Sequence, residues 1–168
     1  IYTKMTTEDL ASFNGEYYQI NDAINQPKPI QKPYPPLWVC GGGEKVTLKL
    51  LAKYGDYGNW DVDLDGFVKK SKILKKHCEN EGRDFDSVGK TLHTDVLIAK
   101  NDKELKKLTT KVAEQRNTDL ESLLKRPLVG TVNQVDDMLG KFEEAGCGYL
   151  IAYISDIVWG DTLELLKN

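Results

Sequence analysis

Three consecutive glycines at positions 41–43 form the stretch of the sequence best suited to hold a ligand. They follow a short apolar run at 37–40, and a helical spacing of apolar residues begins directly after them, at Glu44. Glycine backbone comes close to a ligand, and the free N–H groups of a first helical turn carry the positive end of the helix dipole, so phosphate is the natural guest. The alternative is a tight turn that binds nothing, because neither the spaced glycines of a dinucleotide fingerprint nor the Lys-Ser/Thr of a P-loop is present. These residues alone leave both interpretations open.

An acidic repeat, Asp61, Asp63 and Asp65 followed by Gly66, matches the start of a calcium-binding EF-hand loop. The twelfth position of such a loop is a bidentate glutamate, and here it is Lys72. The preceding segment is also strand-like and not helical. The alternative is a loop in which Asp65 caps the next helix, and we expect no metal site.

Other polar residues carry weaker signals. His93 lies on an expected strand and is a candidate polar contact if the end of that strand lines a pocket; the alternative is a structural or solvated histidine. Arg126 precedes a helix start, where it contacts an anionic ligand or is an exposed loop charge. We interpret Lys69, Lys70, Lys72, Lys75 and Lys76 as a solvated helix face. No Ser/His/Asp or Cys–His arrangement stands out, so no catalytic residue is predicted.

Strand and helix patterns alternate four times after residue 36, which is typical of a parallel sheet with crossover helices. The expected strands are 37–40, 57–60, 91–99 and 149–154, and the expected helices are 44–54, 66–81, 103–116, 132–145 and 160–167, with a short turn at 119–124. Residues 1–36 give the tail of a helix, a short hairpin at an Asn-Gly turn and a rigid connector with five prolines between 27 and 36. We expect one domain over 1–168, with four βα units in 37–168.

Composition excludes several classes of protein. The 168 residues carry a net charge of −3, and only three of the 23 basic residues are arginines, which disfavours a nucleic-acid partner. No apolar run approaches the length of a membrane span, and no charged-then-apolar segment marks a secretory signal, so we expect no membrane partner and a cytoplasmic protein. Three cysteines without C-x-x-C spacing are interpreted as reduced thiols. The chain begins at Ile1 and not at Met, so we expect an upstream piece.

Taken together, several segments resemble the luciferase-like monooxygenase family of flavin- and deazaflavin-dependent oxidoreductases. The matching segments, in order, are Phe13-x-Gly15-x-Tyr17-Tyr18, Pro27-Lys28-Pro29-Ile30-Gln31-Lys32-Pro33, Pro35-Pro36-Leu37-Trp38-Val39 leading into Gly41-Gly42-Gly43, Leu51-Ala52-x-Tyr54-Gly55-Asp56, Gly82-Arg83-Asp84, and Val129-Gly130-Thr131 with Val135 and Leu139. The order and spacing agree over nearly the whole chain.

The resemblance implies an α/β fold, the C-terminal half of a (β/α)8 TIM barrel with four parallel strands and crossover helices. It implies that Gly41, Gly42 and Gly43, with Glu44 and Lys45 beside them, contact the phosphate of coenzyme F420 (a deazaflavin) or FMN. The Phe-x-Gly-x-Tyr-Tyr and Gly-Arg-Asp features favour a deazaflavin. The function expected is cofactor-dependent hydride transfer on a small-molecule substrate, in a protein of which this chain supplies one part.

Departures from the family pattern affect the catalytic part of this expectation. Val132 replaces the usual proline after Gly-Thr, and Gly58-Asn59-Trp60 replaces a more common Gly-Trp-Asn. The first four strands are missing, and with them the usual acid/base groups, so we expect the chain alone to be inactive and to pair with an N-terminal half. The alternative is a non-catalytic half-barrel, a structural or small-molecule-binding protein that dimerises to cover its open edges.

Overall fold

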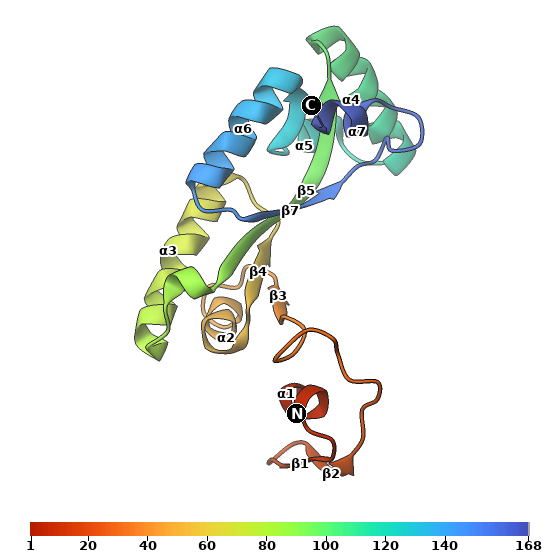
Figure 1. The fold of residues 1–168 in the computed structure, drawn as a ribbon. Helices are drawn as coiled ribbons and strands as arrows, with labels where there is room; N and C mark the ends of the chain where they lie inside the picture. The colour runs from red at the N-terminus through yellow and green to blue at the C-terminus, as the bar shows by residue number, and fades with distance from the viewer. Residues whose placement is uncertain (168) are drawn as a thin grey trace. The chain divides into compact units, whose positions relative to one another are not determined.

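The computed structural model describes residues 1–167 and divides the chain into two compact units, Ile1–Leu37 and Trp38–Asn168. Figure 1 shows both units as ribbons, and each is described by itself below. No helix within 1–167 is both long enough and apolar enough to cross a bilayer.

The first unit contains a short helix and a hairpin. Helix α1 spans Tyr2–Thr7, and strands β1 (Ala11–Asn14) and β2 (Gln19–Ala23) pair antiparallel. The hairpin closes at the expected Asn-Gly turn, where the N–H of Gly15 donates to the carbonyl of Tyr18. The proline-rich segment that follows contains no strand, and the ammonium of Lys28 donates to the carbonyls of Met5 and Glu8. A hairpin and a proline-rich segment without strands thus lie where the sequence placed them.

The second unit is built on a parallel sheet of five strands. They are β3 (Trp38–Cys40), β4 (Tyr57–Trp60), β5 (Gly89–Ala99), β6 (Leu128–Thr131) and β7 (Tyr149–Tyr153). β3 pairs with β4, β4 with residues 89–92 of β5, β6 with residues 96–99 of β5, and β7 with residues 91–95 of β5. The long strand β5 thus connects all the others.

Four of these strands were expected and one was not. No strand was expected at Leu128–Thr131, because Gly130-Thr131 was interpreted as opening the helix 132–145. The segment forms β6, since its amides and carbonyls pair with the extended end of β5 before helix α6 begins at Val132. Gly130 and Thr131 were assigned to the helix start, which left only Leu128 and Val129 as an apolar signal for a strand.

Helices follow the strands nearly where the apolar spacing places them. They are α2 (Thr47–Tyr54), α3 (Leu64–Glu81), α4 (Asp102–Arg116), α5 (Leu120–Leu124), α6 (Val132–Glu144) and α7 (Thr162–Leu166), with a 3-10 turn at Phe85–Ser87. The largest shift is in α2, which was expected to begin at Glu44 and begins at Thr47, after a turn at 44–46.

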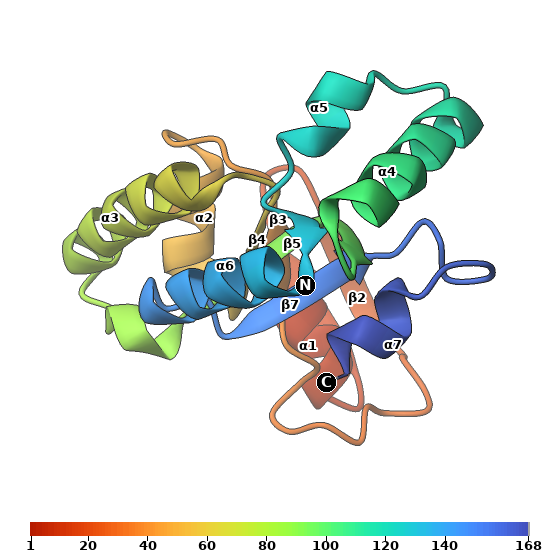
Figure 2. The same ribbon diagram turned by 90° about the horizontal axis from the view of Figure 1, so that it is seen from above.

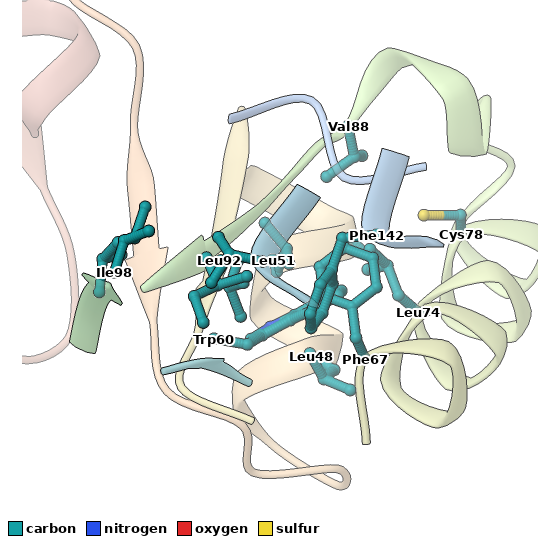
Figure 3. Packing of buried hydrophobic residues seen from close by; sticks show 14 residues of the cluster. Leu48, Leu51, Trp60, Phe67, Leu74, Cys78, Val88, Leu92, Ile98 and Phe142 are labelled. Carbon is teal, nitrogen blue, oxygen red and sulfur yellow. The ribbon is translucent and has the colours of Figure 1, made fainter. Parts of the chain in front are cut away.

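The main core lies between one face of the sheet and helices α2, α3 and α6. Trp60 of β4 meets Phe67 of α3 edge to face at 5.1 Å between ring centroids, and Phe67 meets Phe142 of α6 at 5.5 Å. Figure 3 shows these rings together with Leu48, Leu51 and Leu92. A smaller cluster of Leu97, Val112 and Leu123 attaches α4 and α5 to the far end of β5, where Figure 2 shows these helices apart from α2 and α3. The main core therefore covers one face of the sheet, whereas the smaller cluster covers the other face only at the end of β5, around Leu97 and Val129.

Candidate functional site

The second face of the sheet is open to solvent along the strands β3 and β7 of this unit. Along β7, Leu150 and Ala152 pack on the core, whereas Tyr149, Ile151 and Tyr153 are exposed. The exposed side of β3 carries Trp38 and Cys40. Successive side chains of a strand point to opposite faces, so these residues share the face turned away from the helices.

Aromatic rings occupy the amino end of the open face. The rings of Trp38 and Tyr57 stack at 4.6 Å between centroids, and Tyr149 meets Trp38 edge to face at 5.6 Å. Gly89 stands opposite Tyr57 in the register, and a Cβ there would lie 2.2 Å from Tyr57 Cδ1. The glycine therefore makes room for the Tyr57 ring to lie across β5.

Polar groups follow in the next rows. Cys40, Asn59 and Thr91 are in register on adjacent strands. The Thr91 hydroxyl lies 2.9 Å from Asn59 Oδ1 and 3.0 Å from the carbonyl of Gly58. His93 lies one row further, half-buried and paired with Ile151 in the register. His93 thus shares a face with the polar groups and does not lie at the carboxyl end of β5, which runs on to Ala99.

A four-residue ion-pair network marks the carboxyl end of the open face. Asp95 of β5 is only 8% exposed and accepts hydrogen bonds from Arg116 and Arg126, the latter from Nε at 3.1 Å. Arg126 also pairs with Asp61 at 2.7 Å, and Arg116 lies over the Tyr153 ring. The hydrogen bond and charge of Asp61 raise the pKa of Arg126 further above its usual value. We call these four residues, Asp61, Asp95, Arg116 and Arg126, the mouth network.

The mouth network corrects the interpretation of Arg126. Neither of the two sequence-based alternatives, an anion contact or an exposed loop charge, describes a guanidinium held by two carboxylates. Sequence reasoning also missed Asp95 and Arg116. A usable signal was present: Asp95 directly precedes the apolar run 96–99 of the strand, and a carboxylate buried there needs a cationic partner.

The third arginine has a structural role. Arg83 Nη1 donates to the carbonyls of Leu51, Ala52 and Gly55 at the end of α2, the last at 2.7 Å. Gly82 ends α3 in the left-handed conformation with φ of 66°. The Gly-Arg-Asp motif therefore connects the end of α3 to the end of α2 and does not contribute to the open face.

The glycine loop at 41–43 lies at the same edge of the sheet, directly after β3. Gly41 has φ of +101°, in the region that favours glycine, and its N–H donates to the carbonyl of Asn59. Helix α2 has no side-chain cap. None of the hydrogen bonds found among residues 1–167 starts from the N–H groups of Gly42, Gly43, Glu44 or Lys45. These four amides are the open donors of the loop.

Helix α3 supports the loop from the side of the helical layer. Lys69 pairs with the Glu44 carboxylate at 2.7 Å, and this hydrogen bond and charge lower the pKa of Glu44. Lys70 Nζ donates to the carbonyl of Gly42 at 2.7 Å. The expectation of a solvated face is therefore wrong for Lys70, which is half-buried, whereas Lys69, Lys72, Lys75 and Lys76 are exposed as expected. Lys45 is also exposed.

The acidic repeat at 61–66 is divided among other roles. Asp61 belongs to the mouth network. Asp63, and not Asp65 as expected, caps α3 by accepting from the N–H of Gly66 at 2.8 Å. No group of three or more His, Cys, Asp or Glu side chains arranged to hold a metal occurs within the described chain.

The three cysteines are free. Cys40 is exposed beside the glycine loop, whereas burial raises the pKa of the Cys78 and Cys147 thiols.

Comparisons with known proteins place this arrangement in a family. The sequence model of the luciferase-like monooxygenase family matches residues 1–146. One curated relative, the FMNH(2)-dependent dimethylsulfone monooxygenase of Pseudomonas putida, is 33% identical over 51 residues, which are 30% of this chain and 14% of that protein.

Solved structures show the same fold. An F420-dependent secondary alcohol dehydrogenase matches with a TM-score of 0.69 and 16% identity over 91% of this chain and 52% of its own. The coenzyme F420 dependent tetrahydromethanopterin reductase from Methanopyrus kandleri matches with a TM-score of 0.69 and 13% identity, over 98% of this chain and 56% of the reductase. A long-chain alkane monooxygenase matches with a TM-score of 0.70 and 14% identity, over 94% of this chain and 45% of the monooxygenase.

The chain spans about half the length of these solved structures. Its parallel sheet with crossover helices is the C-terminal half of a (β/α)8 barrel, as expected, and the open face is the side that lines the interior of such a barrel. The sequence match and the fold agree: the chain belongs to the luciferase-like monooxygenase family.

Proposed function

We propose that this chain supplies the phosphate site for a flavin-type cofactor, coenzyme F420 or FMN, in a luciferase-like oxidoreductase. The observation that carries the proposal is the loop after β3, where Gly42, Gly43, Glu44 and Lys45 offer open amides at the carboxyl edge of the sheet. In closed (β/α)8 barrels this edge is the face on which ligands bind.

The residues present fit a phosphate group. The amides precede an uncapped helix whose dipole favours an anion. A Cβ on Gly43 would lie 2.8 Å from Thr47 Oγ1, so only glycine leaves this space free. The unfavourable charge in the loop, Glu44, is paired with Lys69 and is thereby directed to α3.

The chemistry belongs to the ring of the cofactor, which supplies hydride transfer or oxygen activation when it is bound. The part of this chain is to hold the phosphate end and to present the polar rows of the open face, Cys40, Asn59 and Thr91, at the mouth. We favour hydride transfer with a deazaflavin, because the Phe13-x-Gly15-x-Tyr17-Tyr18 and Gly82-Arg83-Asp84 features resemble relatives of that type. Acid/base groups are expected from the N-terminal half, so the chain alone is expected to be inactive.

We propose that an N-terminal half of the barrel covers the open face. The supporting observations are the exposed rings of Tyr149 and Tyr153 and the coverage of about half of each solved relative. A second copy of this chain is the alternative occupant. Sedimentation at low micromolar concentration distinguishes the two, since a clean 19.0 kDa monomer contradicts self-association.

Titration with FMN and with coenzyme F420 tests the cofactor proposal. We expect a change in cofactor fluorescence on binding to the chain reconstituted with an N-terminal half. Replacing Gly42 by valine is expected to weaken binding, because a Cβ there would lie 2.4 Å from Lys70 Nζ and the larger side chain crowds the loop. If neither cofactor responds at high micromolar concentration, with the chain alone or with the reconstituted barrel, the cofactor proposal is wrong.

A further inference from the structure

Two carbonyls of the glycine loop are held by side chains of α3, a role that the sequence did not predict. Lys70 Nζ lies 2.7 Å from the carbonyl oxygen of Gly42. His77 Nε2 lies 2.9 Å from the carbonyl oxygen of Glu44. A carbonyl oxygen only accepts, so the His77 ring donates through Nε2–H. Both contacts come from one helix, and both reach alternate residues of the same loop.

These contacts fix the direction of two peptide planes. In a trans peptide the carbonyl of one residue and the N–H of the next point in opposite directions. Because the Gly42 carbonyl points to Lys70, the Gly43 N–H points away from α3. The Glu44 carbonyl points to His77, so the Lys45 N–H is directed away from α3 as well. Both amides are among the open donors of the loop.

Without such anchors this segment has little to prevent a peptide flip. Glycine adopts positive and negative φ about equally readily, so the Gly42–Gly43 peptide can rotate at small cost. A flipped peptide would turn a carbonyl oxygen, in place of an N–H, to the side from which a phosphate approaches. The oxygen would repel the anion.

We propose that Lys70 and His77 are positioning residues that keep the amides of Gly43 and Lys45 turned toward the phosphate of the bound cofactor. This inference rests on the proposed function. It adds that affinity for the phosphate group depends on two side chains of the outer helical layer.

The test compares cofactors with and without phosphate in Lys70→Met. We compare the affinities for FMN and riboflavin, and those for coenzyme F420 and its phosphate-free deazaflavin core. They are measured in whichever preparation, the chain alone or the reconstituted barrel, binds the cofactor when the chain is wild type. We expect Lys70→Met to lower the affinity for the phosphate-bearing ligand by roughly tenfold or more, which is the effect of losing one charged hydrogen bond. The affinity for the phosphate-free ligand is expected to stay unchanged. Lys70→Arg, which keeps a cationic donor, is expected to restore most of the loss. His77→Ala is expected to have an effect of the same kind, because it removes the side chain that holds the Glu44 carbonyl.

Lys72→Met is the matched control. It removes the same charge from the same helix, and Lys72 is exposed and makes no contact with the loop in the described structure. Equal losses in Lys70→Met and Lys72→Met, or equal losses for ligands with and without phosphate, would overturn the inference. If Lys70→Met does not fold, Lys70→Leu, which also lacks a donor, takes its place with the same expectation. A wild type that binds neither cofactor removes the proposed function, and this inference with it; a wild type that binds and a Lys70→Met that binds equally well removes the inference alone.

Discussion

The two ends of the open sheet face differ in chemistry. At the amino end, the rings of Trp38, Tyr57 and Tyr149 pack on one another over Gly89. At the carboxyl end, Asp95 holds two arginines, and the loop after β3 offers four open amides. The amino end offers aromatic surface, whereas the carboxyl end offers charged groups and hydrogen-bond donors. We propose from this difference that the carboxyl end is the side on which this half of the barrel contributes to function.

The largest effect is expected at the carboxyl end, from Asp95→Ala. The substitution removes the carboxylate that Arg116 and Arg126 share, at a residue that is only 8% exposed in the wild type. We expect a loss of about 3 kcal/mol in the free energy of unfolding, at the lower end for a broken buried pair because both arginines are partly exposed. Urea denaturation measures it. The control is Asp137→Ala, which breaks an exposed pair with Lys141 and is expected to cost less than about 0.5 kcal/mol. Equal costs would show that the mouth network is an ordinary surface network.

At the amino end, Gly89→Ala tests the aromatic packing. The added Cβ would lie 2.2 Å from Tyr57 Cδ1, so the stacked rings must move. We expect a loss of about 2 kcal/mol, in the range of overpacked sites. Gly140→Ala in α6 is the matched substitution, with no atom within 4 Å of the new Cβ, and is expected to be neutral or stabilising. A Gly89→Ala protein as stable as Gly140→Ala would show that the rings do not depend on the glycine.

Thiol reactivity gives a smaller contrast between the open face and the core. Cys40 is exposed at the end of β3, whereas burial raises the pKa of Cys78 and Cys147 and hinders access to them. Mass spectrometry after brief treatment with iodoacetamide at pH 8 is therefore expected to find Cys40 alkylated first. Bound cofactor is expected to slow this reaction, because Cys40 adjoins Gly41. Cys78 reacting at the rate of Cys40 would contradict the packing of α3.

The smallest effect concerns Glu44 and pH. Lys69 lowers the pKa of Glu44 in the folded state, so the pair contributes stability above the unfolded pKa near 4.5 and loses it as pH falls through the folded value. Comparing thermal unfolding of the wild type and Glu44→Gln at pH 7 and pH 3, we expect the wild type to be the more stable only at pH 7. A difference of the same size at both values would mean that the ion pair has no role.

The spacing of apolar residues along the sequence predicted most of the fold, because it indicates which side chains are buried between the helices and the sheet. The run 149–154 is apolar or aromatic throughout, and the strand expected there is confirmed by β7. The short β6 had no such run. The mouth network and the Lys70 contact escaped prediction because they join residues between 21 and 65 positions apart, and a lysine on a helix has the same pattern whether it faces solvent or a loop carbonyl. The glycine loop was found from three adjacent residues, but the direction of its amides depends on side chains 28 and 33 positions away.

The most direct test of the central claim is a ¹⁵N–¹H NMR titration of the chain with FMN and with coenzyme F420, which also detects weak binding. The amides of Gly42, Gly43, Glu44 and Lys45 are predicted to shift, while the indole N–H of Trp38 at the amino end stays in place. Shifts at Trp38 with none at residues 42–45 would contradict the assignment of the phosphate site to the carboxyl end of this half-barrel.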